Sequence, residues 1–144
     1  MSEPVLPLPL VLRQEHDLES VATLAIAEGS HVAITPVTRP LPPDLALALS
    51  SAIASMDPWK RYGFDPAILM RLCMPAEASA PRYLVTHHHE VVGLFALKLG
   101  WMFGSYLHIL AILPSWQGRG IGGAVLGWIE ERARANGERN QFAM

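Results

Sequence analysis

The residues best suited to chemistry form one short segment, in which an apolar run passes through a turn into a cluster of glycines. The apolar run covers residues 110–113, the turn begins at Pro114, and a helix-like pattern follows from Ile121. Glycine lets a backbone approach an anion closely, and the first amides of a helix have no acceptor within it. Together with the helix dipole, this pattern predicts a site for a phosphate or diphosphate. The alternative is a glycine-rich turn that only packs a helix tightly against a sheet.

Two other phosphate-binding motifs fit the segment poorly. A Walker-type loop requires Gly-Lys-Ser/Thr after its glycines, and this sequence lacks it. The letters Gly118-x-Gly120-x-x-Gly123, with Glu138 about 20 residues later, match a dinucleotide fingerprint. In that fingerprint, however, the first glycine directly follows a strand of an early βαβ unit. Residues 114–117 intervene here, which disfavours a dinucleotide site.

The segment resembles the acetyl-CoA motif of the GNAT superfamily of N-acetyltransferases, Gln/Arg-x-x-Gly-x-Gly/Ala after a strand and a short loop. Residues 114–122 read Pro-Ser-Trp-Gln-Gly-Arg-Gly-Ile-Gly and match it in full. The resemblance covers residues 31–144 and implies an α/β, GNAT-like fold, with a mixed, mostly antiparallel sheet flanked by helices. It also implies an acetyltransferase that uses acetyl-CoA as co-substrate, without a metal. The acetyl group would pass by direct attack to a primary amine of a small molecule or protein.

The resemblance places CoA binding at the strand end and the glycine turn. It implies backbone contacts from Leu110 to the thioester carbonyl and from Ile112 to the pantetheine arm. A peptide-like arm can add to an exposed strand edge, and an amide directed at the thioester oxygen stabilises an oxyanion. The glycine amides would hold the diphosphate. The other implied CoA-binding residues are Leu113, Gln117, Gly118, Arg119, Gly120, Ile121, Gly122 and Gly123.

The sequence departs from the family pattern at its end. Family members continue through another strand, a helix and a hairpin, and that helix usually carries a tyrosine that protonates the departing CoA thiolate. This sequence stops at Met144, so we expect a C-terminally incomplete fold with no residue for the acid role. An exposed strand edge recruits other chains, so we also expect a homodimer through that edge and poor turnover. A non-catalytic acyl-CoA-binding module, or an inactive truncated GNAT domain, is therefore the alternative function.

His108 on the motif strand is the candidate base, because an amine must lose a proton before it attacks. A period of two predicts that one face of this strand carries Tyr106, His108, Leu110 and Ile112. A histidine that is only satisfied by a neighbour is the alternative. Trp59 and Tyr62 are candidates for the acceptor site, although Trp59 is equally well explained as a packing anchor. The acceptor itself cannot be inferred from these residues.

The elements that position these residues follow from the periodicity and the turn residues. Residues 1–30 are expected to form an N-terminal arm and a short helix, capped by Asp17 and stopped by Gly29. Residues 31–144 are expected to form the acetyl-CoA-binding domain. We expect strands at 31–38, with Pro36 at an edge or a strand end, and at 82–87, 91–98, 106–113 and 141–144. We expect helices at 44–57, capped by Asp44, at 65–73, and over about 15 residues from Ile121.

Composition excludes several classes of protein. The 144 residues are 51% hydrophobic and 17% charged, with a net charge of −2, which excludes a disordered chain. The near-neutral charge gives no reason to expect a nucleic-acid partner. The single cysteine, Cys73, excludes an internal disulfide framework and favours a cytoplasmic location. Its spacing among apolar residues predicts a core position rather than a nucleophile.

Two further patterns invite functional interpretations that we reject. Residues 87–89 are three histidines, but neighbours on a strand point to opposite faces, so a solvated hairpin tip is expected instead of a metal site. Residues 99–118 carry no charge, but they hold too many polar and helix-breaking groups for a membrane helix. The N-terminal apolar run is interrupted by prolines and has no basic region, so no signal peptide is expected.

Overall fold

A computed structural model describes residues 10–12, 18–56, 59, 61, 63, 66–76, 78–101, 104–135 and 140–143. Six strands of this part form one sheet: β1 (Ala22–Ala25), β2 (His31–Pro36), β3 (Arg82–His87), β4 (Glu90–Trp101), β5 (Gly104–Ile112) and β6 (Asn140–Ala143). The strands lie side by side in chain order, all antiparallel to their neighbours except β6, which runs parallel to β5. The helices are α1 (Pro43–Ala54), α2 (Pro66–Met70) and α3 (Ile121–Ala135). The expected mixed, mostly antiparallel sheet flanked by helices is therefore confirmed.

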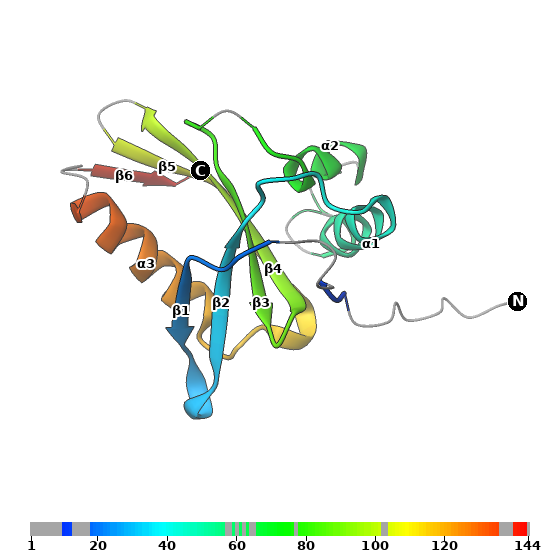
Figure 1. Cartoon of the computed structure of the whole chain (residues 1–144), viewed down its shortest axis with the longest axis horizontal. Coiled ribbons are helices and arrows are strands. Elements are labelled where there is room, and N and C mark those ends of the chain that lie inside the picture. Colours follow the sequence, from blue (N-terminus) through cyan, green and yellow to red (C-terminus); the bar gives the residue numbers. More distant parts are fainter. Residues whose placement is uncertain are drawn as a thin grey trace, which may run out of the picture.

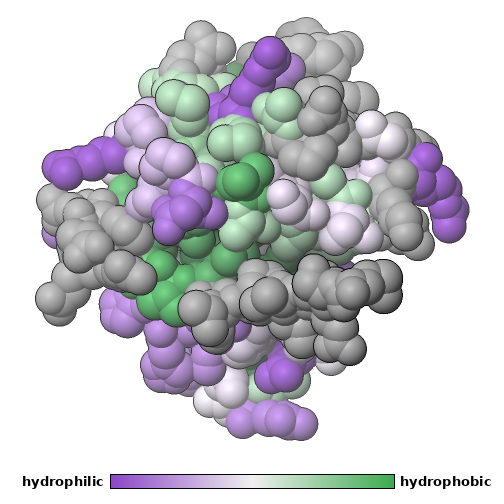
Figure 2. All heavy atoms as spheres, turned by 90° about the vertical axis from the view of Figure 1, so that its right-hand side faces the viewer, coloured by the Kyte–Doolittle hydropathy of each residue, from purple (hydrophilic) through white to green (hydrophobic). Residues whose placement is uncertain are grey.

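Helices cover both faces of the sheet: α3 lies on one side, and α1 and α2 lie on the other (Figure 1). This explains why residues 91–97 of β4 form an uninterrupted buried stretch, since side chains alternate between two covered faces. Leu94 joins the core beneath α1 and α2, whereas Phe95 joins the core beneath α3. Figure 2 looks onto the α1 and α2 side, where apolar and hydrophilic side chains are mixed.

The helix α1 has the predicted inner face but begins one residue earlier than expected. Leu45, Leu49 and Ile53 are buried. Pro42 occupies the cap position, so the prediction of Asp44 as N-cap is wrong. The Asp44 side chain lies in the first turn instead and accepts a hydrogen bond from the Leu45 N–H at 2.9 Å. A carboxylate in that turn still favours the positive end of the helix dipole.

The second helix, α2, begins at Pro66 as predicted but is shorter than expected. It gives way to a 3-10 turn over Arg71–Cys73. Leu72 and Cys73 are buried, as the spacing predicted. The expected cap, Asp65, lies outside the described residues.

The expected helix between Asp17 and Gly29 is wrong. The segment Ala22–Ala25 is a strand with alternating exposure, and it pairs with β2. Four residues are too few to distinguish the period of 3.6 of a helix from the period of 2 of a strand. Pairing with β2 satisfies the backbone groups of these residues. Glu28 and Gly29 have φ of +62° and +74° and turn the chain into β2, so this glycine serves a hairpin turn instead of a helix end. The first described residues also join the sheet, since the Leu12 N–H donates to the His89 carbonyl at 2.7 Å.

Pro36 lies at the end of β2 and not on a sheet edge. β1 pairs with β2 only as far as Ile34, and β3 pairs with it as far as Pro36. The missing N–H of the proline therefore costs no hydrogen bond to β1.

The uncharged residues 99–118 include all of β5 and the 3-10 turn Pro114–Trp116. Within the residues described, no helix has the length and apolar character that crossing a membrane requires.

β5 approaches Gly93 of β4 too closely to leave room for a side chain. A Cβ atom there would lie 2.8 Å from the Ala111 carbonyl oxygen and 2.7 Å from Cδ1 of Ile112. Gly93→Ala should lower the free energy of unfolding by about 1–3 kcal/mol through overpacking. Urea denaturation measures this change.

Gly127→Ala on α3 is the matched control, since its Cβ would meet no atom within 4 Å. It should raise the free energy of unfolding by about 0.5–1 kcal/mol. If Gly93→Ala is as stable as the wild type, β5 does not approach β4 as closely at Gly93 as described.

Candidate functional site

The predicted strand, turn and helix are present at one end of the sheet. β5 ends at Ile112, a 3-10 turn spans Pro114–Trp116, and α3 begins at Ile121. The Ala124 N–H donates to the Gly120 carbonyl at 3.0 Å, as in the first turn of a helix. The amides of residues 121–123 precede this bond and have no intrahelical acceptor. They therefore present donors that the helix itself does not use, at the positive end of α3.

The glycines of this loop, residues 118–123, are not explained by packing. Gly118 and Gly120 have φ of +79° and +84°, a conformation that side chains disfavour. A Cβ atom at Gly118, Gly122 or Gly123 would meet nothing within 4 Å. If these glycines served tight packing of the helix against the sheet, added atoms would collide with the sheet. The loop instead leaves open space where the side chains of these residues would lie.

Side chains and backbone hold this loop in place. The Gln117 side-chain amide donates to the Ile112 carbonyl at 2.8 Å, which ties the loop to the end of β5. The Arg119 guanidinium lies over the Trp116 ring at 4.5 Å, and Nε1 of Trp116 donates to Glu90 at 3.3 Å. Sequence reasoning missed the contact between Trp116 and Glu90, because no pattern links residues 26 positions apart.

One edge of β5 is open beside the loop. β6 pairs with β5 only at residues 104–107, so among the described residues no strand covers residues 108–112 on that side. The Leu113 N–H donates to the Val92 carbonyl of β4 at 2.8 Å. Backbone groups alternate in direction along a strand, so those of Ile112 and Leu110 point to the open edge. The Gln117 side chain already occupies the Ile112 carbonyl, so an added strand or peptide-like arm would use the Ile112 N–H and the groups of Leu110.

His108 occupies a β-bulge in β5. Ile109 pairs with Ala96 and Leu107 pairs with Leu97, which leaves His108 as the extra residue. The bulge breaks the period of two: Leu107 packs in the same cluster as Leu110, whereas Ile109 joins the opposite core. The prediction of one shared face running through His108 to Leu110 therefore fails at this point.

The surroundings of His108 lower the pKa of its imidazole. His108 is exposed overall, but partial desolvation is the largest cause, followed by the positive charges of Lys98 and Arg82. The Arg82 guanidinium donates to the carbonyls of Arg71 and Met74 after α2, so its charge lies on the α1 and α2 side of the sheet. Lys98 lies on the same side, because its neighbours Leu97 and Leu99 pack on the α3 side. A pKa below the ordinary 6.5 keeps the imidazole neutral at pH 7, the form that accepts a proton.

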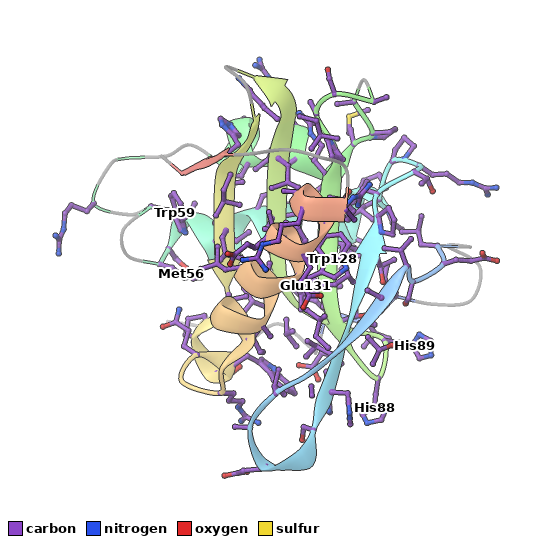
Figure 3. The ribbon with its side chains drawn as sticks, turned by 90° about the vertical axis from the view of Figure 1, so that its left-hand side faces the viewer. Met56, Trp59, His88, His89, Trp128 and Glu131 are labelled. Carbon is purple, nitrogen blue, oxygen red and sulfur yellow. The ribbon has the colours of Figure 1, made fainter. Side chains whose placement is uncertain are left out.

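The candidate acceptor residues are only partly described. Trp59 is half-buried and packs against the core beneath α1 and α2, as the packing-anchor interpretation predicted. In Figure 3, which looks onto the α3 side, the labels of Trp59 and Met56 are at the left of the view, and those of His88 and His89 are at its lower right. Tyr62 lies outside the described residues, so its role at the acceptor site stays a prediction.

The remaining chemically active residues have structural positions. Cys73 is buried with its Sγ 3.9 Å from Oγ of Ser50, and burial raises the pKa of its thiol, which confirms the core prediction. His88 and His89 form the predicted hairpin turn and are exposed, but His87 is not in the tip: it ends β3 with its ring 4.8 Å from that of Trp116. Within the described part of the chain, no three metal-ligating side chains of His, Cys, Asp or Glu gather.

Comparison with known proteins agrees with this geometry. Among solved structures, the GNAT domain of S. lividans PAT is 18% identical with a TM-score of 0.61, over 85% of this chain and 76% of that one. A GNAT family acetyltransferase from Elizabethkingia anophelis, solved with acetyl-CoA bound, is 20% identical with a TM-score of 0.53, over 78% of this chain and 63% of that one. A transcriptional regulator from Bacillus halodurans C-125 is 16% identical with a TM-score of 0.59, over 79% of this chain and 81% of that one.

These likenesses show the fold alone, and no match was found among curated proteins. The sequence model of the acetyltransferase (GNAT) family matches residues 48–143. Because that match covers more than half of the chain and includes β5, the glycine loop and α3, the protein belongs to the acetyltransferase (GNAT) family.

Proposed function

We propose that the protein is an N-acetyltransferase that transfers the acetyl group of acetyl-CoA to a primary amine. The observation that carries the proposal is the open half of β5, which runs directly into the glycine loop and the start of α3. A long ligand with a peptide-like arm and a diphosphate fits both features at once. The arm would add to the strand edge, and the diphosphate would accept hydrogen bonds from the loop amides.

The reaction is a direct transfer between two bound substrates. The amine nitrogen attacks the thioester carbonyl carbon, the C–N bond forms, and the C–S bond breaks to release CoA. The Leu110 N–H, at the open edge of β5, would donate to the carbonyl oxygen as negative charge develops there. The nitrogen loses a proton and the departing thiolate gains one, so acetyl-CoA and the primary amine give the N-acetylated amine and free CoA.

His108 is our candidate for the group that takes the proton from the amine. Its position at the bulge, two residues from Leu110, places it near the proposed thioester site, and its lowered pKa keeps it neutral at pH 7. Trp59 packs on the same side of the sheet as Lys98 and Arg82. We therefore propose that the amine enters from the α1 and α2 side.

Release of free CoA, measured over a panel of small amines, polyamines and peptides, tests this function. Turnover with any of them supports acetyl transfer and identifies the acceptor class. Saturable CoA binding by calorimetry without turnover on the whole panel would instead favour a non-catalytic acyl-CoA-binding module.

The diphosphate site predicts a specific loss of affinity in Gly122→Glu. This residue lies in the first turn of α3, where its Cβ would meet no atom, so the variant should fold. Its carboxylate would enter the space in front of the amides and repel the diphosphate. We expect CoA affinity to fall about 100-fold, measured by isothermal titration calorimetry.

Gly127→Glu places the same charge five residues further along α3, again in open space. This control should bind CoA as the wild type does. A folded Gly122→Glu variant with wild-type affinity would refute the assignment of the diphosphate to this helix start.

The base assignment predicts a change in the pH dependence of turnover. His108→Ala should lower kcat about 10²-fold and remove the acidic limb of the pH–rate profile, with little change in CoA affinity. In the wild type this limb should lie below pH 6.5, because the folded pKa of His108 is lowered. Lys98→Met removes one cause of that lowering, so it should move the limb to higher pH.

Stopped assays between pH 5 and pH 9 would measure these profiles. If His108→Ala keeps the wild-type profile, the imidazole has a structural role only.

A further inference from the structure

The β1–β2 hairpin makes a backbone contact with the glycine loop. The Ala27 N–H, in the turn between the two strands, donates to the Arg119 carbonyl at 3.0 Å. The hairpin precedes the region that matches the family, which begins at residue 48. The contact is therefore a feature of this chain that the family match does not cover.

This hydrogen bond fixes the direction of one peptide group in the loop. In a planar trans peptide, the C=O and the following N–H point in opposite directions. Because the Arg119 carbonyl points to the hairpin, the Gly120 N–H points away from it. Among the residues that the structure describes, no hydrogen bond occupies this N–H. Gly120 has φ of +84°, which allows the chain to continue into α3 from this orientation.

The hairpin is held in place by its own turn and by the core. The Ile26 N–H donates to the Ser30 carbonyl at 2.9 Å and closes the turn. Ala22, Leu24 and Ile26 pack against the core that contains Ile121, the first residue of α3. The same hairpin therefore contacts the helix start through side chains and the loop through a backbone hydrogen bond.

We propose that the β1–β2 hairpin positions the Gly120 N–H toward the CoA diphosphate, through the hydrogen bond from Ala27 to the Arg119 carbonyl. This inference rests on the proposed CoA-binding function and assigns Ala27 as a positioning residue. Without the bond, the peptide between Arg119 and Gly120 is free to rotate, and its N–H is no longer held toward an anion. An oriented donor binds an anion more tightly because less freedom is lost on binding.

Ala27→Pro removes the N–H while keeping the turn. Ile26 is already extended, with φ of −127° and ψ of −172°, as the residue before proline requires. We expect the Kd for CoA, measured by calorimetry, to rise about tenfold. The Kd for pantetheine, which lacks the diphosphate, should stay unchanged in an NMR titration. Ala27→Gly keeps the N–H and should bind CoA with the affinity of the wild type.

If Ala27→Pro does not fold, an ester at this position, made by replacing Ala27 with lactic acid, removes the N–H alone and should give the same tenfold loss. Unchanged CoA affinity in a folded variant, or an equal loss for CoA and pantetheine, would overturn the inference. Absence of CoA binding by the wild type would overturn the proposed function as well, which distinguishes the two failures.

Discussion

The unequal pairing of β5 on its two edges is the constraint on which the candidate site depends. β4 pairs with β5 almost to its end, whereas β6 pairs with it over residues 104–107 only. A strand whose N–H and C=O groups are unpaired must satisfy them with water, another chain or a ligand. The Gln117 side chain already occupies the Ile112 carbonyl. Because the Ile112 N–H and the backbone groups of Leu110 adjoin the glycine loop, an elongated ligand can use the strand edge and the helix start together.

The rest of the fold keeps this edge and the helix start in fixed relation. Residues 91–97 of β4 are buried on both faces and provide the support against which β5 lies. Ile121, Val125 and Ile129 anchor α3 on one face of the sheet, so its first amides lie beyond the end of β5. The loop between them is tied at both sides, by Gln117 to Ile112 and by Trp116 to Glu90. Burial of apolar side chains thus fixes the positions of the β5 edge and of the first amides of α3, whose polar groups the core does not use.

Local patterns predicted much of this arrangement, and contacts between distant residues explain the failures. The strand, glycine turn and helix could be predicted because their signals are contiguous, and the structure confirms them. The segment Ala22–Ala25 was wrongly predicted as helix. Its strand conformation comes from pairing with β2, which the local sequence does not show. The bulge at His108 depends on how β5 pairs with β4. The sequence of β5 by itself does not determine that pairing. The contact between Ala27 and Arg119 likewise joins residues with no pattern in common.

The central claim is that CoA lies along the open edge of β5 with its diphosphate at the start of α3. Backbone amide NMR during a titration with CoA tests this most directly, since each N–H reports on its own hydrogen bond. The account predicts saturable shifts that are largest for the amides of Leu110, Ile112 and residues 118–123. It predicts small shifts for the exposed hairpin turn at His88 and His89. Saturable shifts centred away from β5 and the glycine loop, or no saturable shifts at all, would contradict it.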